Sequence, residues 1–273
     1  MLPVRLRNFI GVFAARVPRD FSRKHFVSVR RVALALVAAW CFVVAVAGGA
    51  VGLVLGNIRL PVIILAATNP AAGAGANIGV SGAAALTAAL AHIRAGRIDW
   101  RLVGWLTPPS VSGAILGGYV SGKVPKDAFL ATIGVVLLLM AADLLRRRRP
   151  PEPRRMTPAE TVLIGGGIGL LGGFVGLILG SLRLPAMLRM GEPLAAAIGT
   201  NATVGFFVGW AGVIGHLPGG VDWALLAVGA AASVPGALLG SLLTGRLPEA
   251  QLKRAIAGVL VVAGIAMLVQ AFV

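Results

Sequence analysis

Two arginines lie inside the hydrophobic parts of this sequence, each in a glycine-rich stretch that ends with proline. Residues 48–61 read GGAVGLVLGNIRLP, residues 172–185 read GGFVGLILGSLRLP, and ten of the fourteen aligned positions are identical. We call these stretches the first break and the second break. Arg59 and Arg183 each supply a fixed positive charge and up to about five N–H donors, in a planar fork that matches an oxyanion. These residue types therefore suit the binding of a small anion.

The glycines and prolines of both breaks predict interrupted helices. Within a helix, glycine costs up to about 1 kcal/mol relative to alanine, and proline costs about 3 kcal/mol. An interruption leaves backbone N–H groups and a helix N-terminus free to attract an anion. We expect four glycines of the breaks to lie near the anion, namely Gly49, Gly52, Gly173 and Gly176.

The polar residues of both halves also have a structural interpretation. Arg59 and Arg183 can end a helix and extend their charged heads to the lipid headgroups, while the glycines serve close helix packing. Asn77 and Asn201 occupy equivalent positions in apolar blocks. They either line a substrate path or make interhelical hydrogen bonds. The sequence leaves both alternatives open.

Polar residues at the loops are interpreted as structural. His92 and His216 stand at the loop end of a block, where an interfacial role is favoured over proton transfer. Asp99 and Asp222 each precede a tryptophan just before a predicted helix, which indicates an N-cap followed by an aromatic anchor. Glu192 is the only acid placed to carry a proton, although the surface of a loop is the favoured position for it.

The elements that position these residues are membrane helices. The chain of 273 residues is 58% hydrophobic and 12% charged, with a mean hydropathy of +0.91. A soluble domain carries roughly twice that charge. Apolar runs of about 20 residues recur along the chain, long enough to cross about 30 Å of hydrocarbon. Their continuous apolar character favours helices over a β-barrel, so the sequence predicts an all-α polytopic transmembrane helix bundle.

The two breaks belong to a longer internal repeat. Asn77 and Asn201 are separated by 124 residues, as are His92 and His216. Duplication at this length is typical of transporters. Each half has four hydrophobic blocks, so we expect about eight helices in two four-helix halves with Gly/Pro-interrupted segments. The expected divisions are a basic arm at 1–31, a first membrane repeat at 32–145, an Arg/Pro-rich linker at 146–156 and a second membrane repeat at 157–273.

The basic residues predict how the chain is oriented in a bacterial inner membrane. The net charge is +16, and fourteen of the 25 Lys and Arg residues lie in the arm and the linker. Such clusters favour contact with anionic lipid headgroups over contact with nucleic acid. Because basic segments stay in the cytoplasm, we expect both segments and both termini there, after an even number of crossings. An even count makes the halves parallel repeats, whereas a re-entrant break would make them inverted, and the sequence does not decide between the two.

Several kinds of chemistry lack their residues in this sequence. It has no P-loop, no Cys/His metal cluster, no GxSxG motif and no pair of carboxylates within a predicted span. We therefore expect no ATP hydrolysis, no enzymatic activity, no bound metal and no cofactor.

Three motifs of the second half occur together in one known family. They are A-x-G-T-[SN] at 197–201, the loop GH followed by GVDW at 215–223, and the ending GxLxG followed by LP at 236–248. With these motifs the chain resembles the sulfite-exporter TauE/SafE family of membrane transporters, more closely in the second half than in the first. The resemblance implies about eight helices, a duplicated unit, and transport of small organic or sulfur oxyanions such as sulfite and sulfonates. It also adds Thr200 to the expected substrate-binding residues.

We therefore expect a secondary transporter, in the exporting direction, that works by alternating access around a site at the two breaks. The alternative is a membrane scaffold or accessory subunit that transports nothing itself. The family usually has glycines where this chain has Arg59 and Arg183, and two cations suit a divalent oxyanion. The expected partners are a small anion and membrane lipid, with no nucleic acid. A homodimer is compatible with the sequence.

Overall fold

The computed structural model describes residues 19–51, 55–146, 157–241 and 249–272. These residues form ten α-helices and one short 3-10 helix, with no strand among them, which confirms the predicted helical bundle. The chain divides into two compact units, Met1–Leu36 and Val37–Val273. The architecture below concerns the second unit, in which both breaks lie.

Each half contains five helices, because the break itself separates two of them. The first half has α2 (Arg19–Val51), α3 (Gly56–Ala66), α4 (Pro70–Arg94), α5 (Trp100–Ser121) and α6 (Lys126–Leu145). The second half has α7 (Pro158–Val175), α8 (Gly180–Arg189), α9 (Leu194–His216), the 3-10 turn Leu217–Gly219, α10 (Trp223–Ser241) and α11 (Glu249–Phe272). The interrupted segments expected in each half appear as the short helices α3 and α8, which are 11 and 10 residues long and add to the four long helices of each half.

Local capping explains where several helices begin. The Asp99 carboxylate accepts a hydrogen bond from the N–H of Leu102 at the start of α5, and the Asp222 carboxylate accepts one from Leu225 in α10. Both predicted N-caps are thus confirmed. Helix α7 starts with a capping box, in which Thr157 and Glu160 each accept from the other's backbone N–H.

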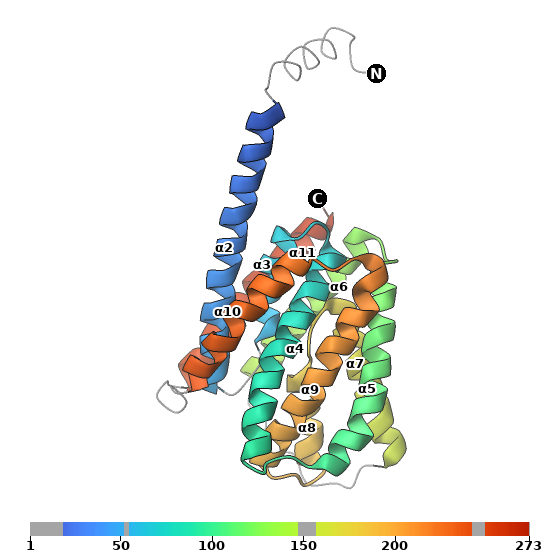
Figure 1. Cartoon of the computed structure of the whole chain (residues 1–273). Helices are drawn as coiled ribbons and strands as arrows, with labels where there is room; N and C mark the ends of the chain where they lie inside the picture. The colour runs from blue at the N-terminus through green and yellow to red at the C-terminus, as the bar shows by residue number, and fades with distance from the viewer. Residues whose placement is uncertain (1–18, 52–54, 147–156, 242–248, 273) are drawn as a thin grey trace. The chain divides into compact units, whose positions relative to one another are not determined.

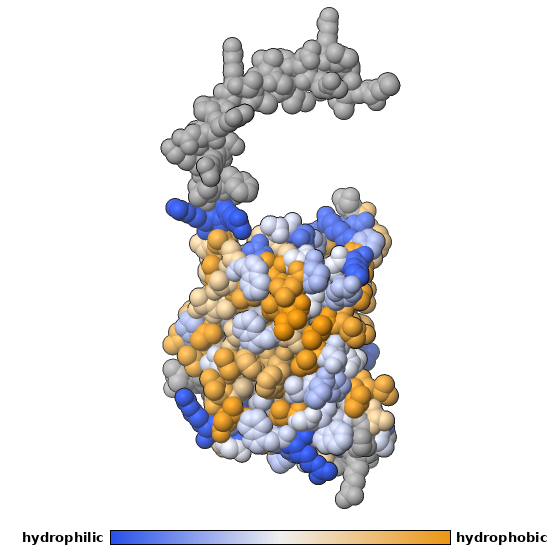
Figure 2. All heavy atoms as spheres, turned by 45° about the vertical axis from the view of Figure 1, so that its right-hand side comes forward, coloured by the Kyte–Doolittle hydropathy of each residue, from blue (hydrophilic) through white to orange (hydrophobic). Residues whose placement is uncertain are grey.

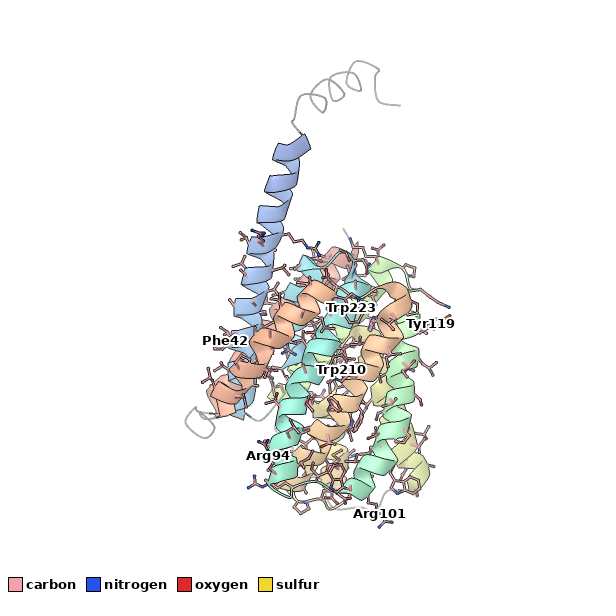
Figure 3. All side chains as sticks on the ribbon, viewed as in Figure 1. Phe42, Arg94, Arg101, Tyr119, Trp210 and Trp223 are labelled. Carbon is pink, nitrogen blue, oxygen red and sulfur yellow. The ribbon has the colours of Figure 1, made fainter. Side chains whose placement is uncertain are left out.

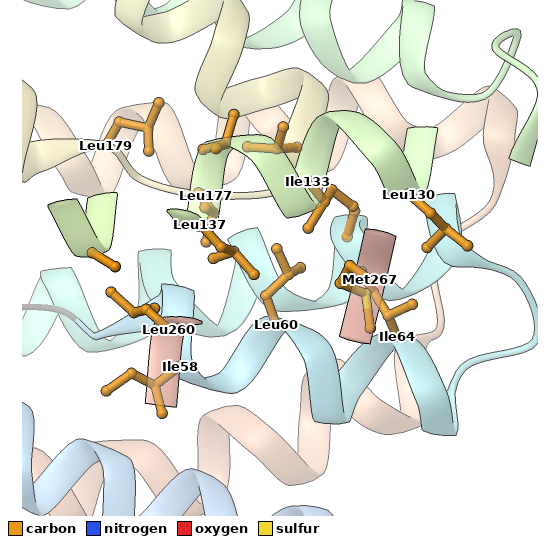
Figure 4. Packing of buried hydrophobic residues seen from close by; sticks show 14 of the residues in the cluster. Ile58, Leu60, Ile64, Leu130, Ile133, Leu137, Leu177, Leu179, Leu260 and Met267 are labelled. Atoms are coloured by element: carbon orange, nitrogen blue, oxygen red, sulfur yellow. The ribbon is translucent and has the colours of Figure 1, made fainter. Parts of the chain in front are cut away.

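The long helices suit a membrane. Five described helical segments are long and apolar enough to cross one, and α3 and the apolar parts of α7 and α11 are shorter. Hydrophobic residues cover much of the face shown in Figure 2, with hydrophilic residues gathered towards its ends. Inside the bundle, α3, α6 and α11 pack against the turn between α7 and α8 in a single hydrophobic cluster (Figure 4). Its members include Leu60, Ile133, Leu177 and Leu260.

The two halves run in opposite directions. Helices α4 and α9 are equivalent in the repeat and pack closely along their length, without side chains between them at the glycines. The pairs in contact run in opposite order along the two helices: Gly75 with His216, Gly82 with Gly209, and His92 with Gly199. The equivalent helices α6 and α11 are also antiparallel, since Gly134 contacts Leu268 while Leu138 contacts Gly264. Antiparallel pairing of equivalent helices defines inverted repeats about a pseudo-two-fold axis.

Each break is followed by a short helix. Helix α3 runs antiparallel to α4, because Gly73 packs on Ile64 while Asn77 bonds the carbonyl of Gly56. After α3, three long helices complete the first half (Figure 1). Of the two alternatives left open by the sequence, parallel and inverted halves, the bundle adopts the inverted one. An odd number of crossings replaces the even number that the charge pattern predicts.

The inverted arrangement also corrects the expected placement of the chain ends. Because α6 and α11 are antiparallel, the linker end of α6 and the C-terminal end of α11 lie at opposite ends of the bundle. The linker and the C-terminus cannot both face the cytoplasm. Figure 3 shows Arg94 and Arg101 at one end, and Tyr119 and Trp223 at the other.

Candidate functional site

Arg59 and Arg183 lie inside the bundle. They occupy the fourth positions of α3 and α8, directly after the two breaks, and their exposed fractions are 1% and 0%. Side chains that anchor in lipid headgroups must reach the surface. The interpretation of these arginines as headgroup anchors is therefore wrong.

The guanidinium of Arg59 is largely satisfied by hydroxyl groups. Its Nη1 donates to the Oγ of Ser233 in α10 at 3.0 Å, and its Nη2 donates to the Oγ of Ser81 in α4 at 2.7 Å. Only its Nε lacks a hydrogen-bond partner. Arg59 thus ties α3 to two long helices, one from each half.

Arg183 is buried with most of its donors unused. Its Nη1 donates to the Oδ1 of Asn201 at 3.4 Å, a long and therefore weak hydrogen bond. Its Nε and Nη2 are shielded from solvent and have no partner. No carboxylate among the described residues acts on either guanidinium. Because a buried charge without a counter-charge is costly, this arrangement favours a bound anion.

The two short helices add partial positive charge at the same places. Their N-cap residues, Leu55 and Leu179, have no side chain that can accept a hydrogen bond from the first turn. In the first turn of α3, the Oδ1 of Asn57 accepts from the N–H of Ile58 at 3.1 Å. In α8, the N–H of Gly180 bonds to the carbonyl of Ile178 at 2.8 Å. A helix N-terminus of this kind favours a nearby anion, and each of these two stands one turn from a buried arginine.

Asn77 connects the two breaks to each other. It is fully buried in α4, and its Nδ2 donates to the carbonyls of Gly56 at 3.1 Å and of Gly176 at 2.9 Å. Gly56 begins α3 and Gly176 follows the end of α7, so this one side chain bridges both interruptions. Asn201, its equivalent in the repeat, is half-buried and contacts Arg183 instead. The two asparagines therefore hold different groups.

Two glycines of the second break have clear local reasons. Gly176 caps α7 with φ of 76°, in the left-handed region, and a Cβ there would lie 2.5 Å from the carbonyl oxygen of Ala74. A Cβ on Gly173 would lie 2.2 Å from the carbonyl oxygen of Ala114 in α5. Gly49 lies near the end of α2, and Gly52 falls outside the described residues.

Thr200 and the histidines lie in contacts between the halves. The hydroxyl of Thr200 accepts from the N–H of Asp99 at 2.9 Å, so it holds the α4–α5 loop and does not contact either arginine. His216 is fully buried between the Gly173 carbonyl, at 2.8 Å from its Nε2, and the Ser121 hydroxyl, at 3.1 Å from its Nδ1. The second break is thus supported by a histidine of α9.

Glu192 stands in the loop between α8 and α9, outside the long helices. Partial burial raises the pKa of its carboxyl above the ordinary value, and the charge of the neighbouring Asp99 and a hydrogen bond with that side chain raise it further. The position of Glu192 in a loop agrees with the sequence-based interpretation.

Three buried serines of the long helices were not among the predicted residues. Ser81 and Ser233 hold Arg59, and Ser110 in α5 is fully buried with an Oγ that has no partner. Ser110 and Ser233 begin the matching segments SVSGAILG and SVPGALLG. This repetition of a serine within apolar helices was the signal that could have identified Ser110 and Ser233.

This architecture defines a class of protein: a polytopic membrane transporter with inverted repeats, whose interrupted helices meet inside the bundle. The family model described as sulfite exporter TauE/SafE matches residues 37–267. The chain therefore belongs to the sulfite exporter TauE/SafE family.

One curated relative supports the same class. The probable membrane transporter protein YjnA of Bacillus subtilis (strain 168) is 26% identical over 226 residues, which cover 76% of this chain and 89% of that protein. No solved structure matches the chain.

Proposed function

We propose that this protein is a secondary transporter that exports a small anion, such as sulfite, a sulfonate or another sulfur or organic oxyanion. It works by alternating access around a site at the two breaks. The family to which the chain belongs is named for sulfite export, and the curated relative is named only as a probable membrane transporter. The substrate class and the direction of transport are parts of this proposal.

The observation that carries the proposal is the state of Arg183. A guanidinium inside a membrane bundle is expensive, and such residues usually mark a substrate path. Arg183 is 0% exposed, keeps two N–H donors without partners, and lies one turn after an uncapped helix N-terminus. An oxyanion supplies both the missing charge and the missing acceptors.

The inverted repeat supports the mechanism. Asn77 joins the two breaks through hydrogen bonds to Gly56 and Gly176, so both interruptions meet inside the bundle. Broken helices at equivalent positions of inverted halves are typical of transport sites, where one half rocks against the other.

We base the orientation on the linker and on one basic loop. The loop with Arg94, Arg97 and Arg101 lies at the same end as the linker, because α5 and α6 are consecutive long helices joined by a short turn. By the positive-inside rule, we propose that this end faces the cytoplasm of a bacterial cell. The C-terminus then lies on the other side.

Transport in proteoliposomes tests the proposal. Purified protein should accumulate or release at least one of radiolabelled sulfite, sulfoacetate and sulfate along a gradient, and Arg183→Gln should abolish the flux while the protein remains folded in detergent. Flux equal to that of empty liposomes for all three anions would instead favour the non-transporting scaffold or accessory subunit.

A further inference from the structure

The two arginines are equivalent in the repeat, but their surroundings are not. At the repeat offset of 124 residues, Ser81 corresponds to Gly205. The Oγ of Ser81 accepts a hydrogen bond from Nη2 of Arg59 at 2.7 Å, whereas Gly205 has no side chain. The second half therefore lacks one of the two serines that hold the first arginine.

The two unpaired nitrogens of Arg183 lie on one edge of its guanidinium, where an oxyanion could bind. In a guanidinium, Nε–H and the outward Nη2–H point in the same direction, as two parallel donors that fit two oxygens of one oxyanion. On Arg183 both atoms are buried and without partners. On Arg59 the Ser81 hydroxyl already holds Nη2 at 2.7 Å. Of these two arginines, Arg183 is the one whose Nε and Nη2 are both without partners.

A third donor comes from α5. Ser110 is equivalent to Ser233, which holds Nη1 of Arg59 at 3.0 Å. Ser110 is 0% exposed, and its Oγ has no hydrogen-bond partner. One turn before and one turn after it, Leu106 and Ala114 belong to the hydrophobic cluster that includes Met187 of α8. Ser110 itself lies against α7, since a Cβ on Gly165 would be 3.1 Å from its Oγ. The equivalence of Ser110 with Ser233 is the basis for assigning this hydroxyl to Arg183.

Resting on the transport function proposed above, we propose that the substrate is bound at one of the two breaks only. Arg183 holds an oxyanion head group through Nε and Nη2, Ser110 donates a further hydrogen bond, and Arg59 is a structural residue locked by serines. The site is thus asymmetric within a symmetric fold, and Gly205 is the residue that keeps it open.

Substitutions at position 205 test this assignment directly. A Cβ at Gly205 would lie 3.2 Å from Cγ2 of Ile178, a contact that requires only a small shift of a side chain. Gly205→Ser restores the hydroxyl found at Ser81 and should occupy Nη2 of Arg183. Gly205→Ala adds the same Cβ without the hydroxyl and is the matched steric control.

Binding should be measured on the purified full chain in detergent, with sulfite and methanesulfonate as probes, by calorimetry and by the shift in thermal unfolding. We expect Gly205→Ser to weaken binding at least tenfold, the scale of one charge-assisted hydrogen bond, and Gly205→Ala to change it less than about threefold. Ser110→Ala should weaken binding by about tenfold, whereas Ser233→Ala and Ser81→Ala should leave it within about threefold.

The outcomes separate this assignment from the proposed function. Equal weakening by Gly205→Ser and Gly205→Ala, or stronger weakening by Ser81→Ala than by Ser110→Ala, would overturn the assignment to Arg183 and leave anion transport standing. Failure of the wild-type chain to bind either probe, together with no flux in proteoliposomes, would overturn the proposed function and the assignment with it.

Discussion

Replacing Asn77 by leucine should remove the hydrogen bonds that join the two breaks and destabilise the protein. Asn77 is fully buried in α4, and its Nδ2 donates to the carbonyls of Gly56 and Gly176 at 3.1 and 2.9 Å. Leucine has the same number of side-chain heavy atoms in the same branched arrangement but no donor, so both carbonyls lose their partner in a buried place. Asn201→Leu is the matched control, because Asn201 is half-buried and has one long hydrogen bond of 3.4 Å.

The magnitude follows from the number of bonds lost. Side-chain hydrogen bonds within membrane bundles contribute about 0.6 kcal/mol on average and up to about 1.7 kcal/mol. Two lost bonds at Asn77 give about 1–3 kcal/mol of destabilisation. One weak bond at Asn201 gives at most about 0.6 kcal/mol, and leucine there gains apolar contact that offsets part of it.

The assay is unfolding of the detergent-purified protein, followed by tryptophan fluorescence or circular dichroism. Asn77→Leu should unfold at a lower temperature than wild type, and Asn201→Leu should remain close to it. If Asn201→Leu lowers the unfolding temperature as much as Asn77→Leu does, the two hydrogen bonds of Asn77 do not stabilise the protein more than the single bond of Asn201. Wild-type stability of Asn77→Leu would refute the reasoning outright.

Three further outcomes are expected. Gly176→Ala should destabilise the protein by more than about 1 kcal/mol, because its φ is 76° and a Cβ would strike Ala74, whereas Gly167→Ala should be neutral because a Cβ there meets nothing within 4 Å. In a cysteine-free background, thiol labelling at position 95 from the cytoplasmic side and at position 123 from the opposite side would support the orientation; the reverse pattern would contradict it. Glu192→Gln should stabilise the protein slightly above the ordinary glutamate pKa, by less than about 0.5 kcal/mol, and not below it. The raised pKa of this carboxyl means that ionisation costs more in the folded state, so the gain should appear as pH rises, and a gain confined to low pH would contradict that sign.

Local features were readable from the sequence. The hydrophobic composition determines a helical membrane bundle, because backbone polar groups in lipid must be paired within helices. Asp99 and Thr157 determine helix starts, since a cap involves residues only three positions away. The breaks were visible as glycines and prolines in an apolar run, and the repeat showed that they were not accidental. Each of these inferences depends on short-range interactions or on composition.

The tertiary structure decided what depends on neighbouring helices. Whether Arg183 reaches the lipid surface or the interior is set by the helices that surround α8, and the sequence could not choose between them. The charge pattern predicted an even number of crossings and left open whether the halves are parallel or inverted, because it cannot tell a hairpin from a span. The contacts of Gly82 with Gly209 and of His92 with Gly199 show the inversion.

The difference between the surroundings of Arg59 and Arg183 could be recognised only from the sequence and the tertiary structure together. The sequence shows that position 81 is serine and that its equivalent in the repeat, position 205, is glycine. The two halves differ at many other positions as well, so this difference does not stand out. Its meaning appears only when the Ser81 hydroxyl is found at 2.7 Å from Arg59. The composition of each helix is fixed by the chain itself, whereas the satisfaction of a buried charge is a property of the groups that folding brings around it.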